Sequence, residues 1–211
     1  ASTGDATNFG DLSAPAPNKY AMMAPVSNST RGVFSGGYGT PGPYSNSNVM
    51  QYITIASTGN SINFGDLTYG TTNAGGCQSS TRGIVAGGQD PAFKNEINFI
   101  TISTLGNAAD FGDLTVARRT LVGGSNAIRG LFAGGQDTSP NADANLVNVI
   151  EYITIATLGD ATDFGDLVGG GNNGKRNLMS PGCSATRCVW HGGKDGSGDG
   201  ETVMEYVQIM N

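Results

Sequence analysis

The sole histidine is the first residue to consider for catalysis. His191 lies in the apolar run Val-Trp-His-Gly at 189–192, and no carboxylate or nucleophile stands at a spacing that would complete a catalytic pair with it. Related segments of the chain carry Ser35, Ala86 and Ala133 at the same position. We therefore interpret His191 as a packed or channel-lining residue and predict no catalytic site.

The three cysteines offer a second kind of chemistry. Cys183 and Cys188 flank a predicted turn at 184–187, so the strands on either side could place their thiols opposite one another. A disulfide is feasible in an oxidising compartment, and two buried reduced thiols are the alternative. Because there is one histidine and no pair of CxxC motifs, a zinc site is not expected.

Carboxylates gather in the loop 195–201, which reads Asp-Gly-Ser-Gly-Asp-Gly-Glu. Asp195, Asp199 and Glu201 could supply the oxygen ligands that Ca²⁺ prefers. Their spacing differs from that of an EF-hand loop, and the related segments hold no equal cluster. A solvated turn is the expected structure here, and we predict no metal and no other cofactor.

A second set of carboxylates belongs to a string that occurs four times. Phe-Gly-Asp-Leu occupies 9–12, 64–67, 111–114 and 164–167, at intervals of 55, 47 and 53 residues. Two further blocks recur in the same order. One is an arginine followed by a short apolar run and a glycine pair, and the other reads Tyr-Ile-Thr-Ile with small changes. The chain therefore consists of four copies of one unit.

Residues that recur once per unit are expected to build the scaffold. We predict that each repeat aspartate accepts hydrogen bonds from turn backbone or from a repeat arginine, and that each repeat phenylalanine packs in the core between units. The aspartates are Asp11, Asp66, Asp113 and Asp166. The arginines are Arg31, Arg82, Arg129 and Arg187. The phenylalanines are Phe9, Phe64, Phe111 and Phe164.

The blocks are typical of β-strands. Tyr-Ile-Thr-Ile alternates large apolar and polar residues, and the apolar run before each glycine pair indicates a buried strand with a tight exit. Turn clusters such as 57–60 separate the strands, and the irregular segment before each Arg-Gly is a fourth strand candidate. No segment has a sustained 3.6-residue period, so almost no helix is expected. Four strands in about 50 residues form a propeller blade, with a solenoid or sandwich as the alternative.

The order of the blocks is permuted across the two ends of the sequence. The chain begins with the Phe-Gly-Asp-Leu segment and finishes with the Tyr-Val-Gln-Ile block at 206–209. We expect the N-terminal strand to pair beside the C-terminal strand and close a ring. The prediction is one all-β domain over residues 1–211, with blades at about 19–67, 70–114, 118–167, and 175–211 together with 1–13.

The composition excludes some partners. The formal net charge is −6, which argues against a nucleic-acid partner and against attraction to an anionic membrane surface. No stretch approaches the ~20 apolar residues of a membrane span. We predict no nucleic-acid binding and no membrane insertion.

The repeat resembles the kelch family. The double glycine of that family matches the glycine pairs at 36–37, 87–88, 134–135 and 192–193. Its third-strand tyrosine matches Tyr52, Phe99, Tyr152 and Tyr206, while phenylalanine stands where the family has a tryptophan on the fourth strand. The resemblance implies a small β-propeller.

The wording of the repeat also resembles one narrower group. Tyr-Ile-Thr-Ile-Ala-Ser-Thr-Gly-Asn, followed by Phe-Gly-Asp-Leu-Thr, is similar to kelch-like repeats in virion proteins of tailed bacteriophages from aquatic hosts. This resemblance implies a location on the virion surface, for example in a tail fibre. The implied partners are other virion proteins, further copies of the chain, or a glycan or protein of the host surface.

Function is expected in the segments that do not repeat. The loops after the glycine pairs, 38–48, 89–96, 136–148 and 194–202, differ in length and composition and should gather on one face. Candidate contact residues are Tyr38, Tyr44, Phe93, Lys94, Asp137 and Asn141. The sequence thus predicts a non-enzymatic structural or binding module, with a lectin-like glycan-binding propeller as the alternative. A propeller enzyme would need a cluster of polar residues at the channel, and the sequence offers none.

Overall fold

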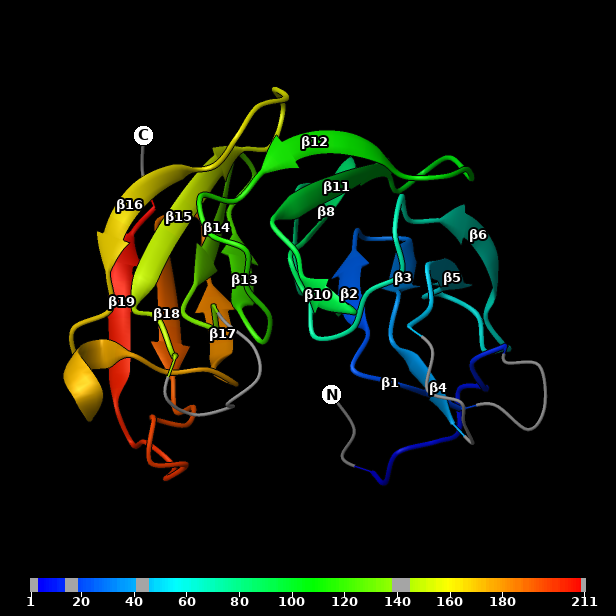
Figure 1. Ribbon diagram of the computed structural model, residues 1–211. Helices are drawn as coiled ribbons and strands as arrows, with labels where there is room; N and C mark the ends of the chain where they lie inside the picture. The colour runs from blue at the N-terminus through cyan, green and yellow to red at the C-terminus, as the bar shows by residue number, and fades with distance from the viewer. Residues whose placement is uncertain (1–3, 14–18, 41–45, 138–144, 210–211) are drawn as a thin grey trace.

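The computed structural model describes residues 4–13, 19–40, 46–137 and 145–209. Over these residues the elements are β-strands, apart from one 3₁₀ turn, η1 (Asn172–Gly174). Four antiparallel sheets follow one another along the chain and form a four-bladed β-propeller (Figure 1). The predictions of an all-β fold, of four blades and of almost no helix are confirmed. In the described part of the chain no helix is long and apolar enough to cross a membrane.

The first three blades have four strands each, numbered from the inside outwards. The first blade consists of β2 (Ala24–Ser27), β3 (Arg31–Ser35), β5 (Val49–Thr54) and β6 (Ile62–Asp66). The second consists of β7 (Gly75–Gln78), β8 (Arg82–Ala86), β11 (Glu96–Thr101) and β12 (Ala109–Asp113). The third consists of β13 (Val122–Ser125), β14 (Arg129–Ala133), β15 (Val149–Thr154) and β16 (Thr162–Asp166). Each repeated block is therefore one strand of a blade.

The core lies between blades rather than within them. Val33 and Met50 of the first blade pack with Ile102 of the second. In the same way, Leu131 of the third blade packs with Trp190 of the fourth. The inner strands continue this arrangement, because β7 packs between β2 and β13, and β13 packs against the inner strand of the fourth blade. Each blade thus needs neighbours on both sides to bury its two faces.

The repeat arginines stack on aromatic rings. The guanidinium carbon of Arg31 lies 4.8 Å from the ring centre of Tyr52, and the same contact occurs in each of the other three blades. Tyr52 in turn meets Phe64 edge to face, with the ring centres 5.9 Å apart. Phe64 and Phe111 are buried between blades as predicted, Phe164 is half-buried, and Phe9 lies beside the first blade.

The predicted pairing of repeat arginines with repeat aspartates is wrong for Arg31 and Arg82. Their guanidinium groups reach instead to the next blade, where they donate to the carbonyls of Ile102 and Ile155 at 3.1 and 2.9 Å. The repeat aspartates contribute through their backbone: the amide of Asp66 donates to Asn107 Oδ1 at 3.0 Å, and Asp11 and Asp113 make the matching bond. The stacked rings hold the arginines away from the carboxylates.

The fourth blade differs from the other three. Its sheet contains β17 (Ser180–Cys183), β18 (Arg187–His191) and β19 (Met204–Gln208), and β19 is its outer strand. The predicted closure of the ring by pairing of the N-terminal segment with β19 is therefore wrong. In Figure 1 the N-terminal segment lies beside the first blade, whereas β19 lies on the other side of the molecule.

The reason is a contact that recurs along the chain. The carbonyls of Phe64 and Asp66 accept hydrogen bonds from Gly106 and Ala108 of the following blade, at 2.9 and 2.8 Å. The carbonyls of Phe9 and Asp11 accept the same bonds from residues 59 and 61 of the first blade, at 2.8 and 2.9 Å. The N-terminal segment thus takes the place of an outer strand that precedes the first blade.

Candidate binding site on the propeller axis

Each blade has a residue with left-handed backbone conformation two residues before its inner strand. The φ angles of Met22, Asn73, Thr120 and Leu178 are 58°, 59°, 54° and 54°. Such angles are uncommon for residues other than glycine. Backbone hydrogen bonds support the conformation: Asn73 N–H donates to Met22 O at 3.2 Å, Thr120 N–H to Asn73 O at 2.8 Å, and Leu178 N–H to Thr120 O at 3.4 Å. The four residues form a hydrogen-bonded arc that links all four blades.

A pocket opens on this arc. It has a volume of about 270 Å³ and is lined by the four left-handed residues, by the residue that follows each of them, and by Val122. We call it the axial pocket. Met23, Leu121 and Met179 supply apolar surface, and Asn73 and Thr120 supply the polar side chains. Four different residue types occupy one backbone position, so the pocket is chemically asymmetric although its scaffold repeats.

The loops that follow the glycine pairs surround the axial pocket and contact one another. Asn46 Nδ2 of the first loop donates to Gln89 O of the second at 2.7 Å. Arg119 then joins the second loop to the third, because its guanidinium donates to Gln89 Oε1 at 2.5 Å and to Gln136 Oε1 at 2.9 Å. We call Asn46, Gln89, Arg119 and Gln136 the loop crown. The segments before the left-handed residues pair with the starts of these loops, which places loops and pocket at one end of the propeller.

The candidate contact residues lie in these loops, and none of those described lines the axial pocket. Tyr38 begins β4 (Tyr38–Thr40), which pairs with β1 (Lys19–Ala21). Phe93 ends β10 (Ala92–Phe93), which pairs with β9 (Gln89–Asp90), and its ring lies 5.1 Å from the Arg119 guanidinium carbon. Lys94 forms an ion pair with Glu96 at 3.5 Å. The amide of Asp137 donates to Asn145 O at 3.1 Å. Tyr44 and Asn141 lie outside the described residues.

The acidic loop uses its carboxylates as acceptors for its own backbone. Asp195 Oδ1 accepts hydrogen bonds from the amides of Ser197 at 2.9 Å and Asp199 at 3.1 Å. Glu201 Oε1 accepts the amide of Gly171 at 2.6 Å. Within the described ranges, no three metal-binding side chains gather at one place. The loop is therefore a turn held by Asx-type hydrogen bonds.

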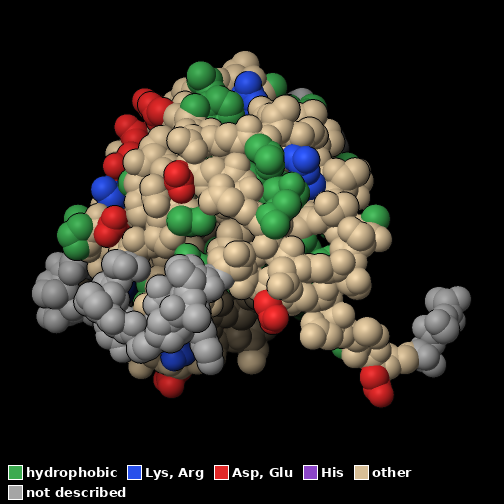
Figure 2. All heavy atoms as spheres, turned by 90° about the vertical axis from the view of Figure 1, so that its right-hand side faces the viewer, with side chains coloured by type: hydrophobic (Ala, Val, Ile, Leu, Met, Phe, Trp, Pro, Cys, Tyr) green, Lys and Arg blue, Asp and Glu red, His purple; other side chains and the backbone are tan. Residues whose placement is uncertain are grey.

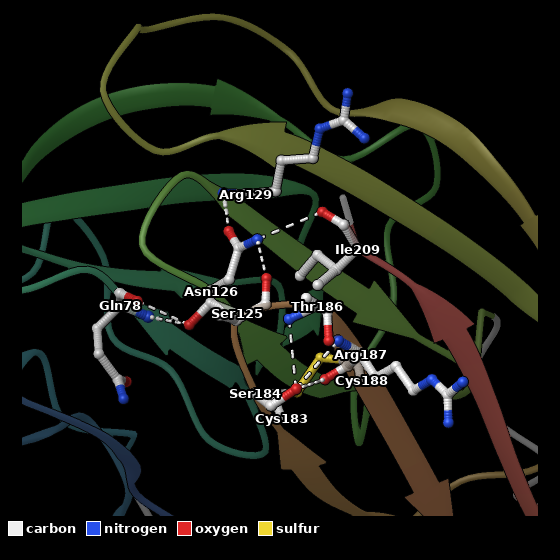
Figure 3. Close-up of a disulfide and its surroundings, with 11 residues drawn as sticks. Gln78, Ser125, Asn126, Arg129, Cys183, Ser184, Thr186, Arg187, Cys188 and Ile209 are labelled. Carbon is white, nitrogen blue, oxygen red and sulfur yellow. Dashed lines mark hydrogen bonds between the residues drawn. A yellow bond between two sulfur atoms is a disulfide. The ribbon is translucent and has the colours of Figure 1, made fainter. Parts of the chain in front are cut away.

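Cys183 and Cys188 form a disulfide across the β17–β18 hairpin, where they are directly paired residues with Cα atoms 4.1 Å apart (Figure 3). Next to the disulfide, Asn126 Nδ2 of the third blade donates to the carbonyls of Ala185 and Ile209 in the fourth, at 3.0 and 3.3 Å. Cys77 is a free, buried thiol, and burial raises its pKa well above the usual range. These residues tie blades together at the end of the propeller opposite the loop crown.

The histidine was interpreted wrongly. His191 is exposed, whereas Ser35, Ala86 and Ala133 at the same position are buried. The outer face of the fourth blade, unlike those of the other three, is uncovered, and this accounts for the difference.

Sequence reasoning missed the axial pocket. A residue in left-handed conformation is readable from sequence when it is a glycine, and here it is Met, Asn, Thr or Leu. One signal was present: each of these residues stands nine positions before a repeat arginine. The arrangement can seat an apolar group and offer it one amide and one hydroxyl for hydrogen bonding.

No protein-family profile matches the chain, and no curated protein is significantly similar to it. The site therefore has to be interpreted from its own geometry.

Proposed function

We propose that this protein is a non-enzymatic binding module of a phage virion surface, such as a tail-fibre component, and that it contacts a protein partner through the axial pocket and the loop crown. The kelch-like repeat wording supports the virion assignment. The observation that carries the binding role is the variation at one backbone position. The scaffold residues repeat from blade to blade, but Met22, Asn73, Thr120 and Leu178 do not, although each occupies the same left-handed position on one pocket.

The lining favours a protein over a glycan. Sugar-binding sites stack pyranose rings on aromatic side chains, and the described residues that line the axial pocket include no aromatic ring. Met22 and Leu178 are exposed at the pocket, and the methionines beside them are adaptable in shape. A projecting apolar side chain of a partner protein fits this chemistry best.

The test compares two double variants. Met22→Ala with Leu178→Ala removes the exposed apolar wall of the pocket, and Leu105→Ala with Leu158→Ala removes equally exposed leucines from turns elsewhere. Binding of each protein to immobilised surface proteins of the virion and of its host is measured by surface plasmon resonance, beside a glycan array. We expect the pocket variant to bind at least about tenfold more weakly and the control to bind like the original protein. Equal binding by both variants, or saturable glycan binding that the pocket variant loses, would contradict the proposal.

A further inference from the structure

The outer face of the fourth blade is exposed where the other blades are buried. Met204 is 75% exposed, whereas its counterparts Met50, Ile97 and Ile150 are 0%, 0% and 2% exposed. Tyr206 is 57% exposed, and its counterpart Tyr52 is 9% exposed. In the first three blades these positions are covered by an outer strand and by the next blade. At β19 the described residues supply neither cover.

The opposite face of the first blade is exposed in a complementary way. Ile55 is 45% exposed, although its counterparts Ile102, Ile155 and Ile209 are buried under the preceding blade at 0%, 1% and 0%. The inner strands agree with this pattern, because Gly83 lies against Val26 of the preceding blade. At the matching position of the first blade, the nearest neighbour is a side chain of its own sheet.

The N-terminal segment already has the position of an outer strand. Besides the bonds at Phe9 and Asp11, the amide of Ser13 donates to Gln51 Oε1 at 2.8 Å. The residue that follows each later outer strand makes the same bond to the next blade, as Thr68 does to Asn98 Oδ1 at 2.9 Å. The segment is thus an outer strand without inner strands, and β17–β19 are inner strands without an outer one.

We propose that two copies of this chain join head to tail, so that the N-terminal segment of one copy becomes the fourth strand of the fourth blade of the other. The register follows from the first blade, where Met50 pairs with Gly65 and Tyr52 with Ile62. In the joined pair, Met204 therefore lies opposite Gly10, and Tyr206 lies opposite Thr7. Strand addition of this kind gains main-chain hydrogen bonds along a free sheet edge.

The same register brings the side chains together. Phe9 meets the ring of Tyr206 edge to face, as Phe64 meets Tyr52 at 5.9 Å. The exposed Met204 then packs under Ile55 of the second copy, as Met50 packs with Ile102 within one chain. The two uncovered faces therefore cover each other.

A second copy fits better than closure within one chain. The N-terminal segment is bound to the first blade by several hydrogen bonds, and Figure 1 places β19 across the molecule from it. The view onto the first blade in Figure 2 shows the beginning of the chain projecting from the body, and residues 4–8 are exposed. The interface is heterologous, so a closed assembly of copies is needed to cover both faces of every chain.

Cross-linking tests the register and the occupant together. Thr7→Cys and Tyr206→Cys are made in separate chains, mixed, and treated with a short bis-maleimide; Thr7→Cys mixed with Leu158→Cys is the control. We expect a cross-linked pair of chains from the first mixture and none from the control, because Cys77 is buried. A chain carrying both cysteines that cross-links only to itself, with no product from the mixture, would overturn the proposal in favour of ring closure.

Complementary charge variants test the interface without cross-linking. Met204→Asp damages one face and Ile55→Asp damages the other, and both residues are exposed in the single chain, so each variant should fold. Sedimentation equilibrium should show self-association of the original protein, with a dissociation constant at least about tenfold higher for each variant alone. Their mixture should form a one-to-one pair through the one intact interface. A monomeric original protein, or variants that associate as it does, would refute the head-to-tail contact.

Discussion

Arg118 and Glu151 form an ion pair in which both side chains are fully buried, with 2.5 Å between Nη2 and Oε2. Glu151 also accepts the amide of Thr115, which follows the outer strand of the second blade, at 2.7 Å. The carboxylate therefore joins the end of one blade to the middle of the next. Burial lowers the pKa of Arg118, and the charge and hydrogen bond of Glu151 oppose this effect.

Removing the carboxylate should destabilise the protein strongly. In Glu151→Gln the Arg118 guanidinium stays buried without a counter-charge, and such losses cost about 3–5 kcal/mol. Chemical denaturation followed by tryptophan fluorescence would measure this, since Trp190 is buried in the core.

The second blade provides a matched control for this change. It has Thr71 and Asn98 where the third has Arg118 and Glu151. The double variant Arg118→Thr with Glu151→Asn imports that solution, and we expect it to recover most of the lost stability. A double variant as unstable as Glu151→Gln would show that the charge pair itself is needed.

Gly65 should be sensitive because of its neighbour and not only because of its backbone. A Cβ atom at Gly65 would lie 2.2 Å from the carbonyl oxygen of Gly106 in the next blade, whereas Gly165 has a similar φ, 139° against 145°, and nothing within 4 Å. Gly65→Ala should therefore cost about 1–3 kcal/mol more than Gly165→Ala. Thermal unfolding of both variants measures the difference, and equal losses would mean that blade-to-blade contact contributes nothing at this position.

The repeat arginines should differ in the same way. Arg82 lies 4.8 Å from the Phe99 ring centre and donates to Ile155 O, while Arg187 has only the ring of Tyr206 as a guanidinium contact among the described residues. Arg82→Ala should lose about 1–3 kcal/mol of unfolding free energy. Arg187→Ala should lose less than half of that. A larger loss for Arg187 in dilute protein would contradict this account of the bond between blades.

An acidic cluster at the outer edge predicts a pH effect. Burial, followed by the carboxylates of Asp160, Asp110 and Glu96, raises the pKa of Asp113. The folded state therefore binds a proton at Asp113 more readily than the unfolded state, and its ionisation at higher pH disfavours folding.

Asp113→Asn should accordingly be more stable than the original protein at neutral pH. Because the group is mostly exposed, the gain should be at most about 0.5 kcal/mol. It should vanish below pH ~4, where the aspartate is protonated in both states. Melting temperatures measured from acid to neutral pH check this, and a gain that persists at low pH would assign the effect to something other than charge.

The amino-acid sequence by itself determined the strands and their order. The alternation in Tyr52–Ile55 and its copies, and the glycine pairs after each apolar run, are local patterns that specify a strand and its exit, so four similar sheets were predictable. The disulfide partners also lie within one hairpin. Local chemistry of this kind is readable without knowing the rest of the fold.

The tertiary structure decided which strand meets which. The N-terminal segment carries the same string as three outer strands, yet its place beside the first blade depends on Gly59, Ser61 and Gln51, far along the chain. The arginines stack on rings rather than pair with aspartates because the strand register brings ring and guanidinium together. The left-handed residues of the axial pocket are supported by hydrogen bonds between blades. These features depend on contacts between distant segments, which a repeat pattern allows but does not select.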